Sequence, residues 1–235
     1  MKMIYPELIK NRFISLSIML MITASAAVSG IAIGCSKLEK NMDKVEKGLT
    51  YVTLCQIFLL FLVPMGIMLL NMLFTSREES CGGWRIVMTS GISSGSVHFA
   101  KIILIFAAVL IMFIPLTIGG IYFIRDLAPG PVTETVLLPL ASAYICFLPM
   151  CVLMYFAAVL LNGTLPVIFS GLLFIISTIF ISSSDMEKYD PLCYPYILSM
   201  NNDNVLYRIA AAIGVSVLLY AAGTLIARKR IAAYI

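Results

Sequence analysis

Residues 76–101 read SREESCGGWRIVMTSGISSGSVHFAK and separate two long stretches that contain no charged residue, 50–76 and 102–124. This segment carries the only Trp and the only His of the chain. Trp84, Val87 and Met88 have the i, i+3, i+4 spacing that puts side chains on one face of a helix. Glycines precede this run, and a Gly/Ser-rich break follows it at Gly91, Ser93, Ser94 and Gly95. The segment therefore predicts a short helix outside the apolar stretches, with one apolar face available to a partner.

The composition is that of a polytopic membrane protein. Hydrophobic residues make up 61% of the 235 residues and charged residues only 12%, and the mean hydropathy is +1.01. A bilayer core about 30 Å thick needs roughly 20 apolar helical residues. The longest charge-free stretch, 135–184, is long enough for two such helices, divided by the turn residues at 162–166. We therefore expect an all-α fold, one transmembrane domain over residues 1–235, with six helices at 13–34, 50–76, 102–124, 135–161, 167–183 and 209–227.

The distribution of Lys and Arg predicts which side of the membrane each loop faces. If the 77–101 loop and both termini are inside, the inside carries nine basic and three acidic residues, and the outside carries seven and nine. This asymmetry favours a cytoplasmic loop at 77–101 and an extracellular segment at 184–206. The four lysines between residues 35 and 47 would then face out, which argues against this topology.

The 77–101 loop resembles the first cytoplasmic loop of ABC exporter permeases of the type-2 class. It is most similar to the permeases that confer self-immunity to lantibiotics and to the related bacitracin-resistance permeases. The resemblance rests on an acidic pair, a Gly-Trp-Arg step, an apolar turn, a small-residue break and a final aromatic-Ala-Lys step at 99–101. The chain has Gly-Ile-Ser-Ser at 91–94, where the family usually has Pro followed by a basic residue.

The resemblance implies that this loop is a coupling helix seated in a cleft of a separately encoded ATPase. The residues that would transmit ATPase closure are Glu78, Glu79, Trp84, Arg85, Val87 and Met88. A minor second cytoplasmic contact with the ATPase is implied at Asn162, Gly163 and Thr164. The implied assembly contains two ATPase copies, which bind ATP and Mg, and a second permease that is identical or related. The chain itself would bind no cofactor.

The segment 184–206 is rich in acidic residues, tyrosines and prolines. This pattern is typical of a re-entrant or interfacial hairpin at the outer leaflet, whose tyrosines rest at headgroup level. It also resembles the extracellular segment before the last helix of type-2 permeases. Candidate substrate-facing residues are Asp185, Glu187, Tyr189, Asp190, Tyr194 and Tyr196. Interfacial anchoring is the alternative interpretation.

Several chemistries lack the residues that they need. None of the six predicted helices contains Asp, Glu, Lys, Arg or His, whereas ion-coupled transport normally uses ionisable groups within the membrane. The chain has no Gly-rich loop ending in Gly-Lys-Ser or Gly-Lys-Thr for ATP phosphates. One His gives no metal-ligand cluster, and Arg85 is too distant from the acidic pair for a Glu-Glu-xxx-Arg intramembrane protease motif. These observations disfavour a secondary transporter and an enzyme.

The remaining polar, proline and cysteine positions leave alternatives open. Gln56 and Asn71 could line a substrate path, but hydrogen bonding between helices is the commoner use of such residues and is the interpretation that we favour. Prolines at 64, 139 and 149 predict bent helices. Three cysteines, at 55, 146 and 151, fall within predicted helices as packing residues. A disulfide between Cys35 and Cys193 is chemically allowed but not required.

Two functions are therefore compatible with the sequence. The first is export of a hydrophobic or cationic antimicrobial peptide by a permease in the bacterial cell membrane, with ATP hydrolysed by the partner. The second is a stand-alone membrane immunity or binding protein that acts without nucleotide. An adjacent ATPase gene would favour the first, and full activity of the purified chain without nucleotide would establish the second.

Overall fold

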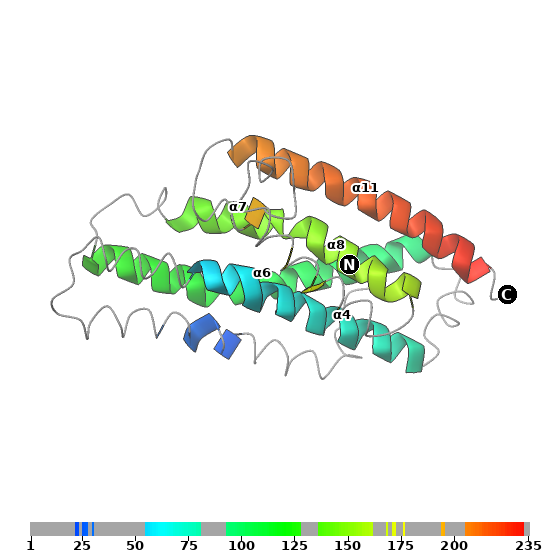
Figure 1. Ribbon diagram of the computed structural model, residues 1–235, viewed down its shortest axis with the longest axis horizontal. Coiled ribbons are helices and arrows are strands. Elements are labelled where there is room, and N and C mark those ends of the chain that lie inside the picture. Colours follow the sequence, from blue (N-terminus) through cyan, green and yellow to red (C-terminus); the bar gives the residue numbers. More distant parts are fainter. Residues whose placement is uncertain are drawn as a thin grey trace.

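The described part of the chain is a bundle of long helices. The computed structural model describes residues 22, 23, 25–27, 30, 55–80, 93–127, 136–161, 168, 171, 172, 176, 194, 195 and 205–232, with backbone alone at 76–80, 123–127 and 228–232. Of these residues 98% are helical and none lies in a strand. The elements in chain order are η1 (Phe58–Leu62), α4 (Val63–Ser80), α6 (Ser94–Leu127), α7 (Leu138–Cys146), α8 (Leu148–Leu161) and α11 (Val205–Ala232). Figure 1 shows α7 and α8 between α11 on one side and the pair α4 and α6 on the other.

Four helices among the described residues are long and apolar enough to cross a membrane. They span Cys55–Thr75, Ser94–Tyr122, Leu138–Leu161 and Val205–Ala227. These helices correspond to the second, third, fourth and sixth predicted helices, and they mark the chain as a membrane protein. The other two predicted helices, 13–34 and 167–183, lie largely outside the described residues.

Prolines coincide with irregular helix geometry at two places. Pro64 lacks the N–H that would bond to the carbonyl four residues earlier, and the turn before it, η1, is a π-helix that ends with Val63 N–H donating to Phe58 O. In the fourth predicted helix, Phe147 interrupts the α-helix with φ −77° and ψ −9°, two residues before Pro149. The predicted bend of this helix is therefore confirmed as a break between α7 and α8.

The helices that flank the predicted loop are longer than their charge-free cores. α4 continues to Ser80, and α6 begins at Ser94, so both ends of the predicted 77–101 loop belong to helices. Ser93 caps the start of α6, because its hydroxyl oxygen accepts the N–H of Ser96 at 3.4 Å. The carbonyl oxygen of Ser93 accepts the same N–H at 3.0 Å. The predicted Gly/Ser break is thus wrong at Ser94 and Gly95, which form the first turn of α6.

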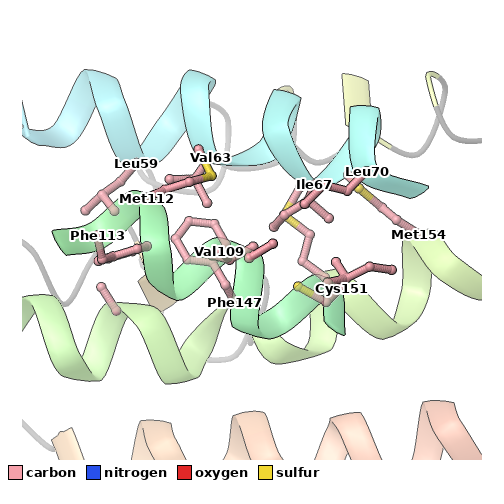
Figure 2. Close-up of a cluster of buried hydrophobic side chains, with 14 of the residues drawn as sticks. Leu59, Val63, Ile67, Leu70, Val109, Met112, Phe113, Phe147, Cys151 and Met154 are labelled. Atoms are coloured by element: carbon pink, nitrogen blue, oxygen red, sulfur yellow. The ribbon is translucent and has the colours of Figure 1, made fainter. Parts of the chain in front are cut away.

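The apolar core lies where α4, α6 and α8 meet. In Figure 2, side chains from η1 and α4 face side chains of α6, with the α7–α8 helix beside them. All the labelled residues are at most 4% exposed. Between helices in a bilayer, close packing rather than water exclusion is the main attraction, so this interdigitation holds the three helices together. The labelled residues are Leu59, Val63, Ile67, Leu70, Val109, Met112, Phe113, Phe147, Cys151 and Met154.

The cysteines within the described helices pack as the sequence predicts. Cys55, Cys146 and Cys151 are free thiols and are buried. The two cysteines of the allowed disulfide, Cys35 and Cys193, lie outside the described residues.

Candidate functional site

The first two turns of α6, directly after the segment that resembles a coupling helix, are buried against other helices. Val97, His98 and Lys101 are exposed by 3%, 0% and 1%. Phe99, on the opposite face, is 55% exposed. This alternation follows the helical period, so one face of the α6 start is fixed inside the bundle.

A buried hydrogen bond joins this face of α6 to α8. Nδ1 of His98 lies 2.9 Å from the hydroxyl oxygen of Tyr155, and both residues are 0% exposed. The His98 ring also lies 5.6 Å from the ring of Phe156. Because a buried polar group is costly without its partner, this hydrogen bond favours one position of α6 against α8.

A second hydrogen bond joins the same turn of α6 to α11. The Tyr220 hydroxyl donates to the carbonyl oxygen of Gly95 at 2.8 Å. The Tyr220 ring also meets the rings of Phe99 and Phe156, with centroids 5.9 and 6.1 Å away. The start of α6 is therefore attached to two helices, and we refer to Gly95, His98, Tyr155, Phe156 and Tyr220 as the His98 cluster.

Further along, α6 is attached to α7 by an aromatic contact. The Tyr144 hydroxyl donates to the carbonyl oxygen of Phe106 at 3.0 Å, and the two rings stack with centroids 4.3 Å apart. The Tyr144 ring also meets the edge of Phe113 at 5.7 Å. α6 is thus held against the same bundle over several turns beyond the His98 cluster.

Three ionisable residues lie within the helices that could cross a membrane, which corrects the sequence-based picture. His98 and Lys101 are part of Ser94–Tyr122, and Arg208 is part of Val205–Ala227. Arg208 is 7% exposed and Lys101 1%. The predicted helices were bounded at the first charged residue, whereas backbone hydrogen bonding continues past it. The absence of ionisable groups therefore no longer argues against ion-coupled transport.

The predicted coupling residues are placed only in part. Glu78 and Glu79 form the last turn of α4. The other four, Trp84, Arg85, Val87 and Met88, lie outside the described residues.

The predicted second contact, Asn162, Gly163 and Thr164, is also outside the described residues, but it follows Leu161, the last residue of α8. Figure 1 shows that the end of α4, the start of α6 and the ends of α8 and α11 gather at one end of the bundle. The two stretches predicted to meet an ATPase therefore both leave helices at this end.

The predicted substrate-facing segment is described at one candidate residue. Tyr194 is 1% exposed and packs with Cys146 and Ala212, and the guanidinium carbon of Arg208 lies 5.9 Å from its ring centroid. The remaining candidates, Asp185, Glu187, Tyr189, Asp190 and Tyr196, lie outside the described residues.

Asn71 differs from the interpretation that the sequence favoured. Its amide nitrogen donates to the Ile67 carbonyl of its own helix at 2.8 Å, and Asn71 is 0% exposed. Its amide oxygen has no hydrogen bond within the described part of the chain. A short polar side chain reaches the carbonyl one turn back more easily than a neighbouring helix, so the expected bond between helices is not formed by this amide nitrogen.

The His98–Tyr155 and Tyr220–Gly95 hydrogen bonds were not predicted from the sequence. The one available signal was that the only His precedes an apolar stretch by four residues, a position that is also typical of a membrane edge. Within the described residues, no group of three or more His, Cys, Asp or Glu residues could hold a metal ion.

Comparison with known proteins identifies no relative of this chain. The chain matches no protein-family model, no curated protein and no solved structure. Any functional assignment therefore depends on the residues of the chain and on their arrangement.

Proposed function

We propose that this chain is the membrane-spanning permease subunit of a bacterial ABC transporter, and that it exports a hydrophobic or cationic antimicrobial peptide for self-immunity or resistance. ATP is hydrolysed by a separate subunit. The observation that carries the proposal is that α6, the helix directly after the segment that resembles a coupling helix, has its first turns attached to both α8 and α11.

This attachment is what a coupling segment requires of the helix that follows it. A force applied to residues 81–93 moves the first turn of α6. The hydrogen bonds of His98 and of Gly95 then carry the displacement to α8 and α11. Packed helices transmit such a displacement as discrete shifts, because packed interiors do not deform continuously. Closure of an ATPase at this end of the bundle would therefore displace α6, α8 and α11 together.

The choice of substrate rests on the resemblance to lantibiotic-immunity permeases. Acidic residues in 184–206 are compatible with a cationic peptide. The assembly would contain a second permease, identical or related, and two ATPase copies.

The first experiment is purification of the chain from its native membrane in a mild detergent, followed by mass spectrometry of the proteins that accompany it. A stoichiometric P-loop ATPase supports the permease. A clean preparation without such an ATPase supports the alternative, a stand-alone membrane immunity or binding protein that acts without nucleotide.

A variant of the coupling segment tests the mechanism directly. The double change Gly83→Pro with Trp84→Asp removes the apolar anchor, and we expect loss of ATPase co-purification and of resistance. Thr89→Asp is the control, because the helix predicted from the sequence would put residue 89 on the face opposite Trp84, Val87 and Met88. Unchanged co-purification and resistance in the double variant would show that the coupling assignment is wrong.

A further inference from the structure

Arg208 is a buried charge at the end of a membrane-spanning helix. It lies in the first turn of α11, is 7% exposed, and its Nη1 atom is buried without a hydrogen-bond partner among the described residues. None of the residues whose side chains are described is Asp or Glu. A guanidinium stays charged at any physiological pH, and a buried charge without a counter-charge is strongly unfavourable. The observations point to an anion outside the described residues.

The contacts around Arg208 supply only partial compensation. Its guanidinium carbon lies 5.9 Å from the centroid of the Tyr194 ring, a cation–π distance. Tyr194 in turn packs on Cys146 and Ala212. An aromatic face stabilises a cation, but it accepts no hydrogen bond in the plane of the guanidinium, where the N–H groups point. Tyr194 therefore contacts Arg208 through its ring, and Nη1 of Arg208 remains without a hydrogen-bond partner among the described residues.

The position in α11 adds to the demand for an anion. The first turn of a helix carries a partial positive charge, and its N–H groups have no acceptor within the helix. Arg208 thus adds a full positive charge to the positive end of α11, where a carboxylate or a phosphate is favoured instead. An anion at this place would interact with the guanidinium and with the helix terminus together.

The depth of Arg208 selects the source of the anion. Arg208 is three residues beyond Val205, where the apolar segment Val205–Ala227 begins. At 1.5 Å per residue this is about 4.5 Å of helix, so the guanidinium lies within reach of the lipid headgroups. Leu206 and Tyr207, beside it in the sequence, are exposed by 84% and 63%. Such exposure is typical of residues that meet lipid at a membrane interface.

We propose that Arg208, in contact with the Tyr194 ring, binds the phosphate group of a membrane phospholipid. The planar guanidinium fork matches two phosphate oxygens in a bidentate arrangement. The proposal requires a membrane protein but not a permease, so its success or failure is independent of any ATPase partner.

The test is lipid binding by the full chain, purified in detergent and stripped of native lipid. Phosphatidylglycerol, diacylglycerol with the same acyl chains, and inorganic phosphate are titrated separately, with the melting temperature and native mass spectrometry as readouts. We expect phosphatidylglycerol alone to bind and to raise the melting temperature. Arg208→Met should weaken this binding about tenfold or more, the scale of losing one charge-assisted hydrogen bond, and Arg208→Lys should retain part of it. Leu218→Ala, an exposed position ten residues further along α11, is the control and should bind as the unmodified chain does, whereas Tyr194→Leu should bind more weakly.

Three results would overturn the proposal. Equal stabilisation by inorganic phosphate would assign the site to a soluble anion, and equal stabilisation by diacylglycerol would assign the effect to the acyl chains. Equal phosphatidylglycerol affinity in Arg208→Met would remove Arg208 from the site. The lipid-free proteins give an independent check, because we expect lipid-free Arg208→Met to be at least as stable as the unmodified chain. A marked loss of its stability would reveal a carboxylate partner within the chain and would also refute the proposal.

Discussion

Gly223 permits the close approach of α11 to α8, and replacing it tests the packing behind the His98 cluster. A Cβ atom added at Gly223 would fall on the ring of Phe156, against three of its carbon atoms. The Phe156 ring is 5% exposed and is surrounded by the rings of His98, Tyr155 and Tyr220, with centroids 5.6, 5.3 and 6.1 Å away. Because these neighbours fill the space around the ring, Gly223→Ala must displace either the ring or the helix.

Gly214 provides the matched control, because it lies in the same helix and an added Cβ there meets nothing within 4 Å. Alanine is favoured over glycine in a helix by about 1 kcal/mol at both positions. This propensity contribution is the same for both variants. The difference in free energy of unfolding between Gly223→Ala and Gly214→Ala is therefore the cost of overpacking at Gly223, which is about 1–3 kcal/mol. Gly223→Ala should be the less stable variant by that amount.

The assay is equilibrium unfolding in mixed micelles, with sodium dodecyl sulfate as the denaturant and helical circular dichroism as the signal. Each variant is compared with the unmodified chain at the same micelle composition. If Gly223→Ala is as stable as Gly214→Ala, then α11 does not pack on Phe156 as described and the link between α8 and α11 is refuted.

Three further variants or measurements test the bundle. Tyr155→Phe removes the hydroxyl bound to Nδ1 of His98 and should lower the free energy of unfolding by about 1–2 kcal/mol. Tyr144→Phe should lower it by less, because the Tyr144 hydroxyl donates to a carbonyl that already belongs to a helix. A larger loss for Tyr144→Phe than for Tyr155→Phe in the same unfolding assay would contradict the His98 cluster. Asn71→Leu removes a buried amide oxygen that has no hydrogen bond within the described residues and should change stability by less than about 1 kcal/mol; a loss of resistance without loss of stability would assign Asn71 to a substrate path. Cys151 is 0% exposed, so a maleimide should modify it only after denaturation; rapid labelling of the folded chain, located by peptide mass spectrometry, would show that this part of the core is open.

The sequence was informative where a local property of one segment, such as its hydropathy or a proline, is enough to predict the structure of that segment. The charge-free stretches around Pro64 and Pro149 predicted helices, and the described helices include both, with an irregular turn before each proline. The cysteine at 151 was predicted as a packing residue and is buried. Each of these predictions depends only on neighbours along the chain, because hydropathy and the missing proline N–H act locally.

The sequence was less informative at the helix ends and at the polar residues. Ser94 and Gly95 were predicted as a break but form the first turn of α6, where the Ser93 hydroxyl oxygen accepts the N–H of Ser96 and caps the helix. Asn71 was expected to bond to another helix, whereas its amide nitrogen bonds to its own. The burial of Arg208 was not predicted, because a charge next to an apolar stretch normally marks the membrane surface.

The sequence by itself determined that this chain is a membrane protein of long helices. That conclusion follows from length and hydropathy, which add up residue by residue and need no knowledge of neighbours in space. The tertiary structure alone decided that the start of α6 is held by Tyr155, 57 residues away from His98, and by Tyr220, 125 residues away from Gly95. Such pairings depend on the relative position and rotation of whole helices. Those are set by the packing of many side chains at once, and no single segment of the chain encodes them.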